Sequence, residues 1–215
     1  MNNPRRWLIP HCLATLTAAL HLCAGCSEST QEPNCINPSV AMTTTMGTII
    51  LELDLAQAPV SVCNFLGYVG ACFYDSTVIH RVVPGYVIQG GQYTQNLQEK
   101  EPRDPIICEY NNGLSNLRGT IAVARAWAPN SGTCQFFINL VDNTWLDKPA
   151  GTNPAGYAVF GRVTGGMDVV DAIGRVPTSP QRTPGGEYLG EVPVTPVIVL
   201  SIRLIHQDGH AARDR

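Results

Sequence analysis

Apolar residues occur in short runs from residue 40 onward, and turn-forming residues separate these runs. Over 48–54 the pattern partly alternates between apolar and polar positions, which predicts a strand. Similar runs predict further strands over 76–83, 86–89, 119–124, 135–141, 157–163 and 197–205. Before the last of them, residues 177–193 are rich in Pro and Gly, so we expect a loop there.

Two segments have the spacing of a helix. Pro59 is a favoured first residue of a helix, and apolar side chains follow it at helical spacing: Val62, Phe65, Leu66 and Val69. A second, short helix fits 166–173 and ends at Gly174. Many short strands with only two helices favour an antiparallel sandwich or barrel over a fold of βαβ units. We find no internal repeat and no domain break after residue 38.

The first 25 residues are typical of a signal peptide, so we exclude them from fold prediction. Two arginines precede an apolar run that is short and interrupted, whereas a stable membrane span needs roughly 20 apolar residues. Small residues then precede Cys26, which resembles the lipobox of bacterial lipoproteins, although Cys23 stands where leucine is usual. A plain cleavable signal is the alternative. Residues 1–25 are therefore predicted to be a lipoprotein signal peptide and 26–38 a linker.

The leader predicts export to the periplasm, with lipidation at Cys26 as the only attachment to a membrane. Ser27, rather than Asp, follows this cysteine and favours the outer membrane. A redox pair of Cys23 and Cys26 fits less well, because such pairs lie in a folded βαβ unit. Outside the cytoplasm the remaining thiols favour one or two disulfides, although several could be small buried hydrophobic residues. These thiols belong to Cys35, Cys63, Cys72, Cys108 and Cys134.

Composition and charge exclude several classes of protein. The chain is 44% hydrophobic and 14% charged, enough apolar residue to bury a core and unlike a disordered chain. Its formal net charge of −3 disfavours a nucleic-acid partner. After the leader the only histidines are His80 and two near the charged tail over 207–215, so we expect no histidine metal site and no Ser-His-Asp triad. Hydrolase, P-loop and dinucleotide-binding motifs are absent from the sequence.

Polar residues interrupt two of the apolar runs. Arg81 and Gln89 lie in runs that a Pro-Gly turn joins, and Gln135 precedes two phenylalanines. Strand alternation places Arg81 on the same face as Ile79, and Gln135 on the same face as Phe137. Either these polar residues cover the solvent faces of two strands, or they line an amphipathic pocket.

These segments, His-Arg-Val-Val-Pro-Gly-Tyr-Val-Ile-Gln-Gly-Gly and Gln-Phe-Phe-Ile-Asn, resemble the signature of the cyclophilin-type peptidyl-prolyl cis-trans isomerases. Blocks at 118–125, 145–147 and 157–161 match in the same order and spacing. The resemblance is closest to the exported bacterial branch, and we assign residues 39–206 to the isomerase domain. It implies a mainly β fold: a closed eight-stranded antiparallel barrel capped by two helices. It implies no metal and no cofactor.

The chemistry of the X-Pro bond indicates how such a protein would act. Rotation breaks amide resonance and meets a barrier of ~18–20 kcal/mol. As the bond twists, the prolyl nitrogen regains a lone pair, so a fixed donor aimed at it stabilises the twisted state more than either planar state. The resemblance assigns this donor to Arg81, held in place by Gln89. Arginine suits the role because it stays charged and presents a rigid fork of donors.

The resemblance also assigns the residues that bind substrate. Proline-containing polypeptides would bind with the proline ring in a pocket made by Tyr86, Val87, Phe137 and Leu146. Gln135 and the backbone of Ala124 and Arg125 would align the preceding residue, and Trp145 and Tyr157 would flank the groove. Four positions depart from the usual pattern of the family: Tyr86 for Phe, Val87 for Met, Arg125 for Asn and Tyr157 for His. Trp145 is associated in the family with cyclosporin-type inhibitors.

Other interpretations remain at this stage. Trp145 could be an ordinary core aromatic, and His80 a structural histidine. In place of an isomerase that assists the folding of exported proteins, the domain could be a binding module or holdase for proline motifs. A thiol-disulfide oxidoreductase would rest on Cys23 and Cys26 alone. Among disulfides our first choice is Cys108–Cys134, because by resemblance both regions border the groove.

Overall fold

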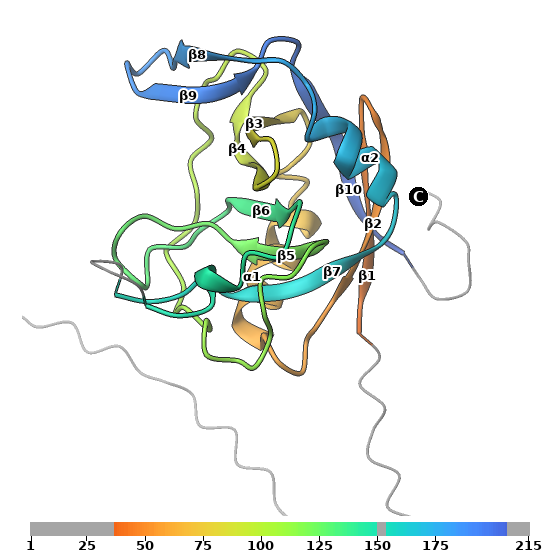
Figure 1. Cartoon of the computed structure of the whole chain (residues 1–215), viewed down its shortest axis with the longest axis vertical. Coiled ribbons are helices and arrows are strands. Elements are labelled where there is room, and N and C mark those ends of the chain that lie inside the picture. Colours follow the sequence, from red (N-terminus) through yellow and green to blue (C-terminus); the bar gives the residue numbers. More distant parts are fainter. Residues whose placement is uncertain (1–36, 150–153, 206–215) are drawn as a thin grey trace, which may run out of the picture. The chain divides into compact units, whose positions relative to one another are not determined.

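Eight strands form a closed antiparallel barrel in the computed structural model, which describes residues 37–149 and 154–205. Around the barrel their order is β1-β10-β3-β4-β6-β5-β7-β2 (Figure 1). The strands are β1 (Ser39–Thr44), β2 (Gly47–Leu53), β3 (Thr77–Val83), β4 (Val87–Thr94), β5 (Thr120–Val123), β6 (Phe136–Asn139), β7 (Val159–Gly165) and β10 (Val197–Ile205). The closed eight-stranded barrel that the sequence predicts is confirmed.

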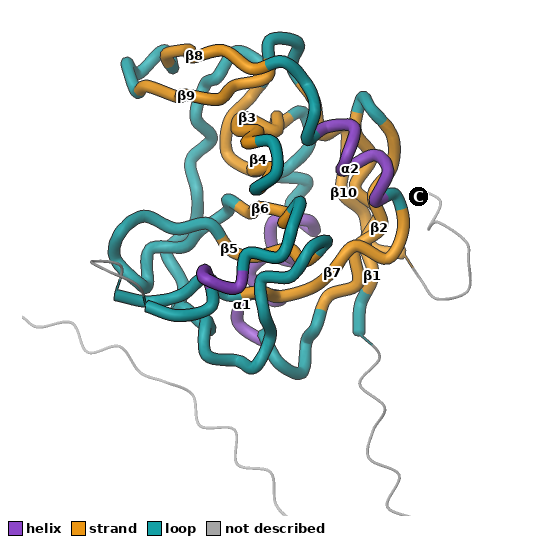
Figure 2. The backbone as a smooth tube through the Cα atoms, in the orientation of Figure 1, coloured by secondary structure: helices purple, strands orange, loops and turns teal. Residues whose placement is uncertain are grey.

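Two helices accompany the barrel: α1 (Pro59–Gly70), which contacts β7 and β10, and α2 (Met167–Ile173), which contacts β2 (Figure 2). Helix α1 buries most of its predicted stripe in the core, where Phe65 packs against Phe136 and Phe160. Its first turn has no cap of its own; instead the carboxylate of Glu109 accepts hydrogen bonds from the backbone N–H groups of Val60 and Ser61. In the two described ranges, no helix has the length and apolar character to cross a bilayer.

Strand β4 is longer than its apolar run suggests, because it continues through Gly90 and Gly91. Both glycines are needed for close packing rather than for a turn. A Cβ on Gly90 would lie 2.8 Å from the side chain of Ile79, and one on Gly91 would lie 2.7 Å from the carbonyl oxygen of Cys134. This glycine pair therefore marks a place where neighbouring strands approach closely.

The segment expected to be a loop, 177–193, contains a β-hairpin instead, made of β8 (Thr178–Arg182) and β9 (Tyr188–Pro193). Pro180 lies where the register between the two strands shifts, a position that tolerates a missing N–H. The hairpin packs on β3 through Val192, which joins a buried cluster with Val78 and Tyr93. Tertiary burial thus outweighs a composition that favours turns.

Strand β3 does not alternate regularly, and this decides where Arg81 points. Ile79 pairs with Gly90 and Arg81 pairs with Gln89, so β3 holds one extra residue, His80, opposite β4. Because of this bulge, Ile79 and Val82 both enter the barrel core. The prediction that Arg81 and Ile79 share a face is therefore wrong.

The cysteines do not form the predicted bridge. In the described part of the chain Cys63, Cys72, Cys108 and Cys134 are all free. Cys134 is buried in the core, where burial raises the pKa of its thiol to about 11. Cys134 is thus the small buried hydrophobic residue of the alternative interpretation, and the pairing Cys108–Cys134 is wrong. Cys35, and with it the lipidation predicted at Cys26, lies outside the described residues.

Candidate active site

A cavity of about 220 Å³ opens beside β4, β5 and β6. It brings together nine of the eleven residues that the resemblance assigns to catalysis or substrate binding. They are Arg81, Tyr86, Val87, Gln89, Ala124, Arg125, Phe137, Leu146 and Tyr157. Gln135 and Trp145 do not line this cavity.

The cavity floor is apolar. Val87, Phe137 and Leu146 are buried in one cluster, and Tyr86 and Tyr157 pack against it. Strand alternation supplies two of these side chains, because Ile88 and Ile138 point into the barrel core while their neighbours face outward. Leu146 comes from a short 3₁₀ helix, η1 (Thr144–Leu146). Together these residues form a small hydrophobic concavity with a cation, Arg81, at its rim.

Trp145 stands beside this cavity rather than in the core. Its side chain is 60% exposed, and its ring stacks on Tyr86 with centroids 5.5 Å apart and an interplanar angle of 18°. The alternative of a core aromatic is therefore wrong. The indole edge is open to solvent next to the cavity.

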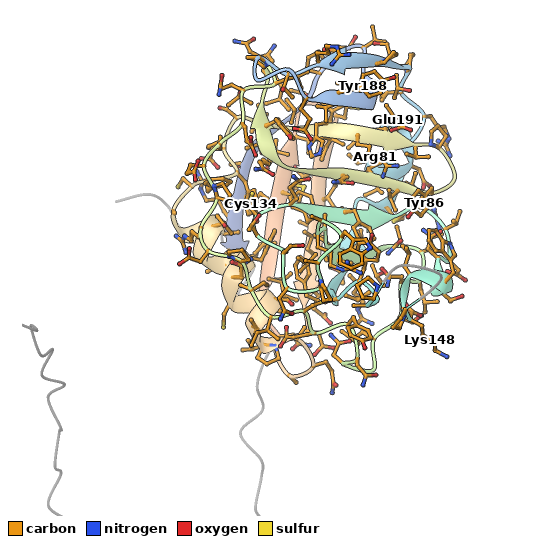
Figure 3. The ribbon with its side chains drawn as sticks, turned by 90° about the vertical axis from the view of Figure 1, so that its left-hand side faces the viewer. Arg81, Tyr86, Cys134, Lys148, Tyr188 and Glu191 are labelled. Carbon is orange, nitrogen blue, oxygen red and sulfur yellow. The ribbon has the colours of Figure 1, made fainter. Side chains whose placement is uncertain are left out.

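The side chain of Arg81 makes a single hydrogen bond with the rest of the described chain. Its Nε donates to the carboxylate of Glu191 at 3.2 Å, and its Cζ lies 5.9 Å from the ring centroid of Tyr86 (Figure 3). Within the described ranges neither Nη atom has a hydrogen-bond partner. Gln89 is the cross-strand neighbour of Arg81, but no hydrogen bond joins the two side chains. The direct polar contact to Arg81 comes from Glu191 rather than from Gln89.

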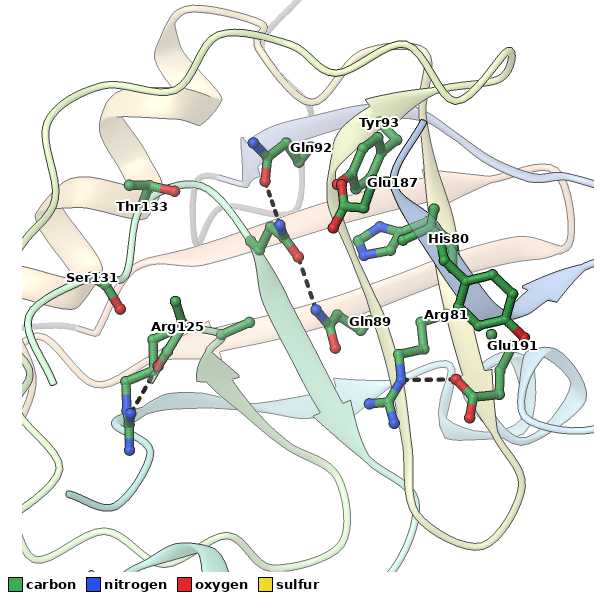
Figure 4. A pocket seen from close by; sticks show the side chains of 16 residues that line it. His80, Arg81, Gln89, Gln92, Tyr93, Arg125, Ser131, Thr133, Glu187 and Glu191 are labelled. Carbon is green, nitrogen blue, oxygen red and sulfur yellow. Dashed lines mark hydrogen bonds and ion pairs between the residues drawn. The ribbon is translucent and has the colours of Figure 1, made fainter. Parts of the chain in front are cut away.

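Gln89 belongs to a line of amides instead. Its Nε2 donates to Gln135 at 2.8 Å, and Gln135 donates to Gln92, as the dashed lines in Figure 4 show. Gln92 in turn donates to the carboxylate of Glu99. Because this chain of hydrogen bonds ends on the carboxylate of Glu99, which can only accept, each glutamine turns its NH₂ group toward Glu99 and its oxygen toward the Gln89 end. This fixes the orientation of Gln89 and Gln135.

A second cavity, of about 550 Å³, adjoins the first. The two share Arg81, Gln89, Ala124 and Arg125 in their walls, and Gln135 lines the second. The hairpin closes one side of this second cavity with residues 187–191. An extended chain crossing the first cavity would therefore continue into the second.

Comparison with known proteins identifies this arrangement. The family described as "Cyclophilin type peptidyl-prolyl cis-trans isomerase/CLD" matches residues 39–203. The chain belongs to the cyclophilin-type peptidyl-prolyl cis-trans isomerases. The protein is thus an enzyme that isomerises X-Pro peptide bonds, as the resemblance implied, and the family binds proline-containing peptides.

Bacterial isomerases are similar over most of their length. The peptidyl-prolyl cis-trans isomerase of Acinetobacter baylyi is 48% identical over 168 residues, which cover 78% of this chain and 86% of that protein. Isomerase A of Dickeya dadantii is 45% identical, covering 77% and 84%. A solved cyclophilin-type isomerase of Cryptosporidium parvum, crystallised with the dipeptide Ala-Pro, has a TM-score of 0.64 at 23% identity. It covers 79% of this chain and 99% of its own, which supports the fold.

Two further residues near the cyclophilin cavity have roles other than direct chemistry. His80 is 3% exposed, and burial, with the charge of Arg81, lowers its pKa to about 4. It is therefore a neutral, structural histidine near pH 7. Arg125 donates to the backbone carbonyls of Ala126, Trp127 and Gly156 and lies over the ring of Tyr157, so it fixes the loop beside the cavity.

Sequence reasoning missed Glu191, Gln92 and Glu99 in this cyclophilin. Gln92 directly follows the Gln-Gly-Gly of the quoted signature, but strand alternation from Gln89 would place it on the opposite face, so the pattern gave no signal for it. Glu191 gave none, because its contact with Arg81 joins positions 110 residues apart through a hairpin that the composition concealed.

Proposed function

We propose that the apolar cavity holds the proline ring of a substrate and that Arg81 stabilises the twisted X-Pro amide. The observation that carries the proposal is the placement of Arg81: a permanently charged fork at the rim of a small cavity with an apolar floor, with both Nη atoms free of partners in the described structure. A donor that is already oriented and unused costs little reorganisation when the prolyl nitrogen becomes an acceptor.

The mechanism needs no proton transfer. The substrate amide begins planar, and its nitrogen lone pair is delocalised into the carbonyl. When the bond twists, the lone pair returns to the nitrogen and accepts a hydrogen bond from an Nη atom of Arg81. Since the planar forms lack this acceptor, the interaction favours the transition state over both ground states and accelerates the reaction in both directions.

The remaining cavity residues orient the substrate in this proposal. Val87, Phe137 and Leu146 provide an apolar floor for the pyrrolidine ring. The residue before proline would lie along Ala124 and Arg125, toward Gln135 and the second cavity. Trp145 and Tyr86 would border the other side, and the same groove would accept cyclosporin-type inhibitors.

Exchange spectroscopy on an Ala-Pro peptide tests the proposal, with Arg81→Lys as the key variant. Wild-type protein in catalytic amount should accelerate cis–trans exchange, whereas a module that only binds would shift the peptide signals without doing so. Arg81→Lys keeps the charge but loses the rigid fork, so we expect at least a ten-fold loss of kcat/KM. Arg162→Lys, in an exposed ion pair between β7 and β2, is the matched control. Full activity of Arg81→Lys would contradict the role of the fork.

We further propose that the enzyme assists the folding of exported proteins while anchored to the outer membrane through Cys26. Support comes from the leader sequence alone: a basic start, an apolar run and small residues before the cysteine. Mass spectrometry of the mature N-terminus decides the matter, because a lipidated Cys26 would begin the mature chain. A mature chain that starts elsewhere without lipid, or membrane association that survives Cys26→Ala, would exclude the anchor.

A further inference from the structure

The β8–β9 hairpin brings a carboxylate to the candidate catalytic arginine. Glu191 lies on β9, and its Oε2 accepts the Arg81 Nε–H at 3.2 Å. In Figure 4 the two side chains face each other at one end of the second cavity. Their side chains are 36% and 46% exposed for arginine and glutamate, so the pair is half-buried rather than freely solvated.

The hairpin is held in place independently of this ion pair. Val192, next to Glu191, is buried against Val78 and Tyr93, and the hydroxyl of Tyr93 donates to Glu187 at 2.6 Å. Strand alternation on β9 then directs Glu191 to the side opposite Val192, toward the cavity. The carboxylate is therefore presented by a fixed element.

The position of the bond on the guanidinium matters more than its strength. An acceptor on Nε holds the guanidinium at the nitrogen that joins it to the aliphatic chain, and so restricts rotation about the last bonds of the Arg81 side chain. Both Nη donors stay available. Tyr86, 5.9 Å away, borders the other side of the same group. A carboxylate on the Nη atoms would instead occupy the donors that the reaction needs.

We propose that Glu191 is a positioning residue for Arg81: it holds the guanidinium in the orientation that meets the twisted amide. This rests on the proposed role of Arg81. Because the pair is half-exposed, its contribution is modest, and removing it should cost about two- to five-fold in kcat/KM. The binding of the planar peptide should be unchanged, because Glu191 acts only through a group that engages the transition state.

Two substitutions separate geometry from charge. Glu191→Ala removes the acceptor, and we expect the full two- to five-fold loss in kcat/KM with an unchanged peptide Kd from chemical-shift titration. Glu191→Gln keeps an amide oxygen to accept from Nε, so it should retain most of the activity. Glu52→Gln breaks a comparable exposed pair with Arg162 on the barrel wall and serves as control. Wild-type activity of Glu191→Ala, or a loss in Glu191→Ala that appears equally in peptide affinity, would overturn the proposal.

A double-mutant cycle distinguishes this proposal from the role of Arg81 itself. If Glu191 works through Arg81, adding Glu191→Ala to Arg81→Ala should cause no further loss, measured at enzyme concentrations that keep turnover above uncatalysed exchange. An equal loss in both backgrounds would show that Glu191 acts by another route, and the role of Arg81 would stand. If Arg81→Ala alone were fully active, the proposed function would fail first.

Discussion

Two polar regions of this barrel, the asparagine network around Asn139 and the bulge of β3, differ in how completely their polar groups are hydrogen-bonded. Between the loops that flank β5 and β6, the buried Asn139 uses both amide hydrogens, on Asn116 and Thr120, and its oxygen accepts from Asn143. The backbone and side-chain N–H groups of Asn116 in turn converge on Asp147. Each member of this asparagine network is held by several others.

At the bulge of β3 the situation is reversed. His80 Nδ1 is the only buried side-chain nitrogen or oxygen in the described structure without a partner, and Arg81 beside it leaves both Nη atoms unused. A buried polar group without a partner costs stability, and this applies to His80 Nδ1, whereas the Nη groups of the half-exposed Arg81 can be solvated. The asparagine network thus ties the loops together, whereas the two Nη donors of Arg81 stay unpaired at the cavity, where the proposed function needs them.

The largest effect we expect is on the asparagine network. Asn139→Ala should lower the free energy of unfolding by about 3–4 kcal/mol, because it removes three hydrogen bonds and leaves buried partners unsatisfied. Urea unfolding measures this loss, and the kcat/KM of the folded fraction should be unchanged. A loss below about 1 kcal/mol would mean that the asparagine network contributes little to stability, which would contradict its structural role in the comparison.

Because of His80 in the bulge, the stability of the folded protein should depend on pH, whereas the isomerase rate should not. The pKa of His80 is about 4 in the folded protein and ordinarily about 6.5. Between these values the unfolded chain binds a proton that the folded chain does not. The contribution of His80 to the free energy of unfolding is therefore fully present above pH 6.5. It decreases by about 2–3 kcal/mol as the pH falls toward 4.

Unfolding curves of wild type and His80→Gln from pH 7 to 4 measure how the free energy of unfolding depends on pH. The carboxylates contribute to both proteins, so the difference between the two pH dependences is due to His80. The isomerase rate should stay flat between about pH 5.5 and 8.5, because arginine does not titrate there and His80 remains neutral. A rate inflection near pH 6.5 that disappears in His80→Gln would assign the chemistry to His80 rather than Arg81.

The smallest effect concerns the rim of the site. Trp145→Phe keeps the stacking on Tyr86 but removes the indole N–H. We expect peptide turnover within about two-fold of wild type and about two- to ten-fold weaker cyclosporin-type inhibition, the range for one neutral hydrogen bond. Equal inhibition of the two proteins would leave Trp145 with only a packing role.

Periodicity alone predicted much of the scaffold. The stripe after Pro59 is the buried face of α1. The apolar run over 197–205 is strand β10, although its buried positions shift from Val197 and Val199 to Ile202 where its register with β1 is irregular. The alternation that places Gln135 and Phe137 outward also holds, since Phe136 and Ile138 fill the core. Local patterns suffice where the structure is regular.

The remainder depends on contacts that no local pattern records. The bulge at His80 comes from the pairing of β3 with β4, and it turns Arg81 out of register with Ile79. The hairpin over 178–193 packs against β3 through Val192, a contact that its Pro- and Gly-rich composition conceals. The bond between Arg81 and Glu191 needs both features at once, so the resemblance indicated the arginine while no local pattern indicated its partner.

The central claim is that Arg81 acts on the twisted amide and not on the bound ground state. The direct measurement is the exchange rate and the peptide Kd of Arg81→Ala, side by side, with Arg162→Ala as the control for losing an exposed ion-paired arginine. The account predicts a loss of about 10- to 150-fold in kcat/KM, a nearly unchanged Kd and an unchanged Tm. Near-normal isomerisation by a folded Arg81→Ala protein, or a loss of affinity as large as the loss of rate, would contradict it.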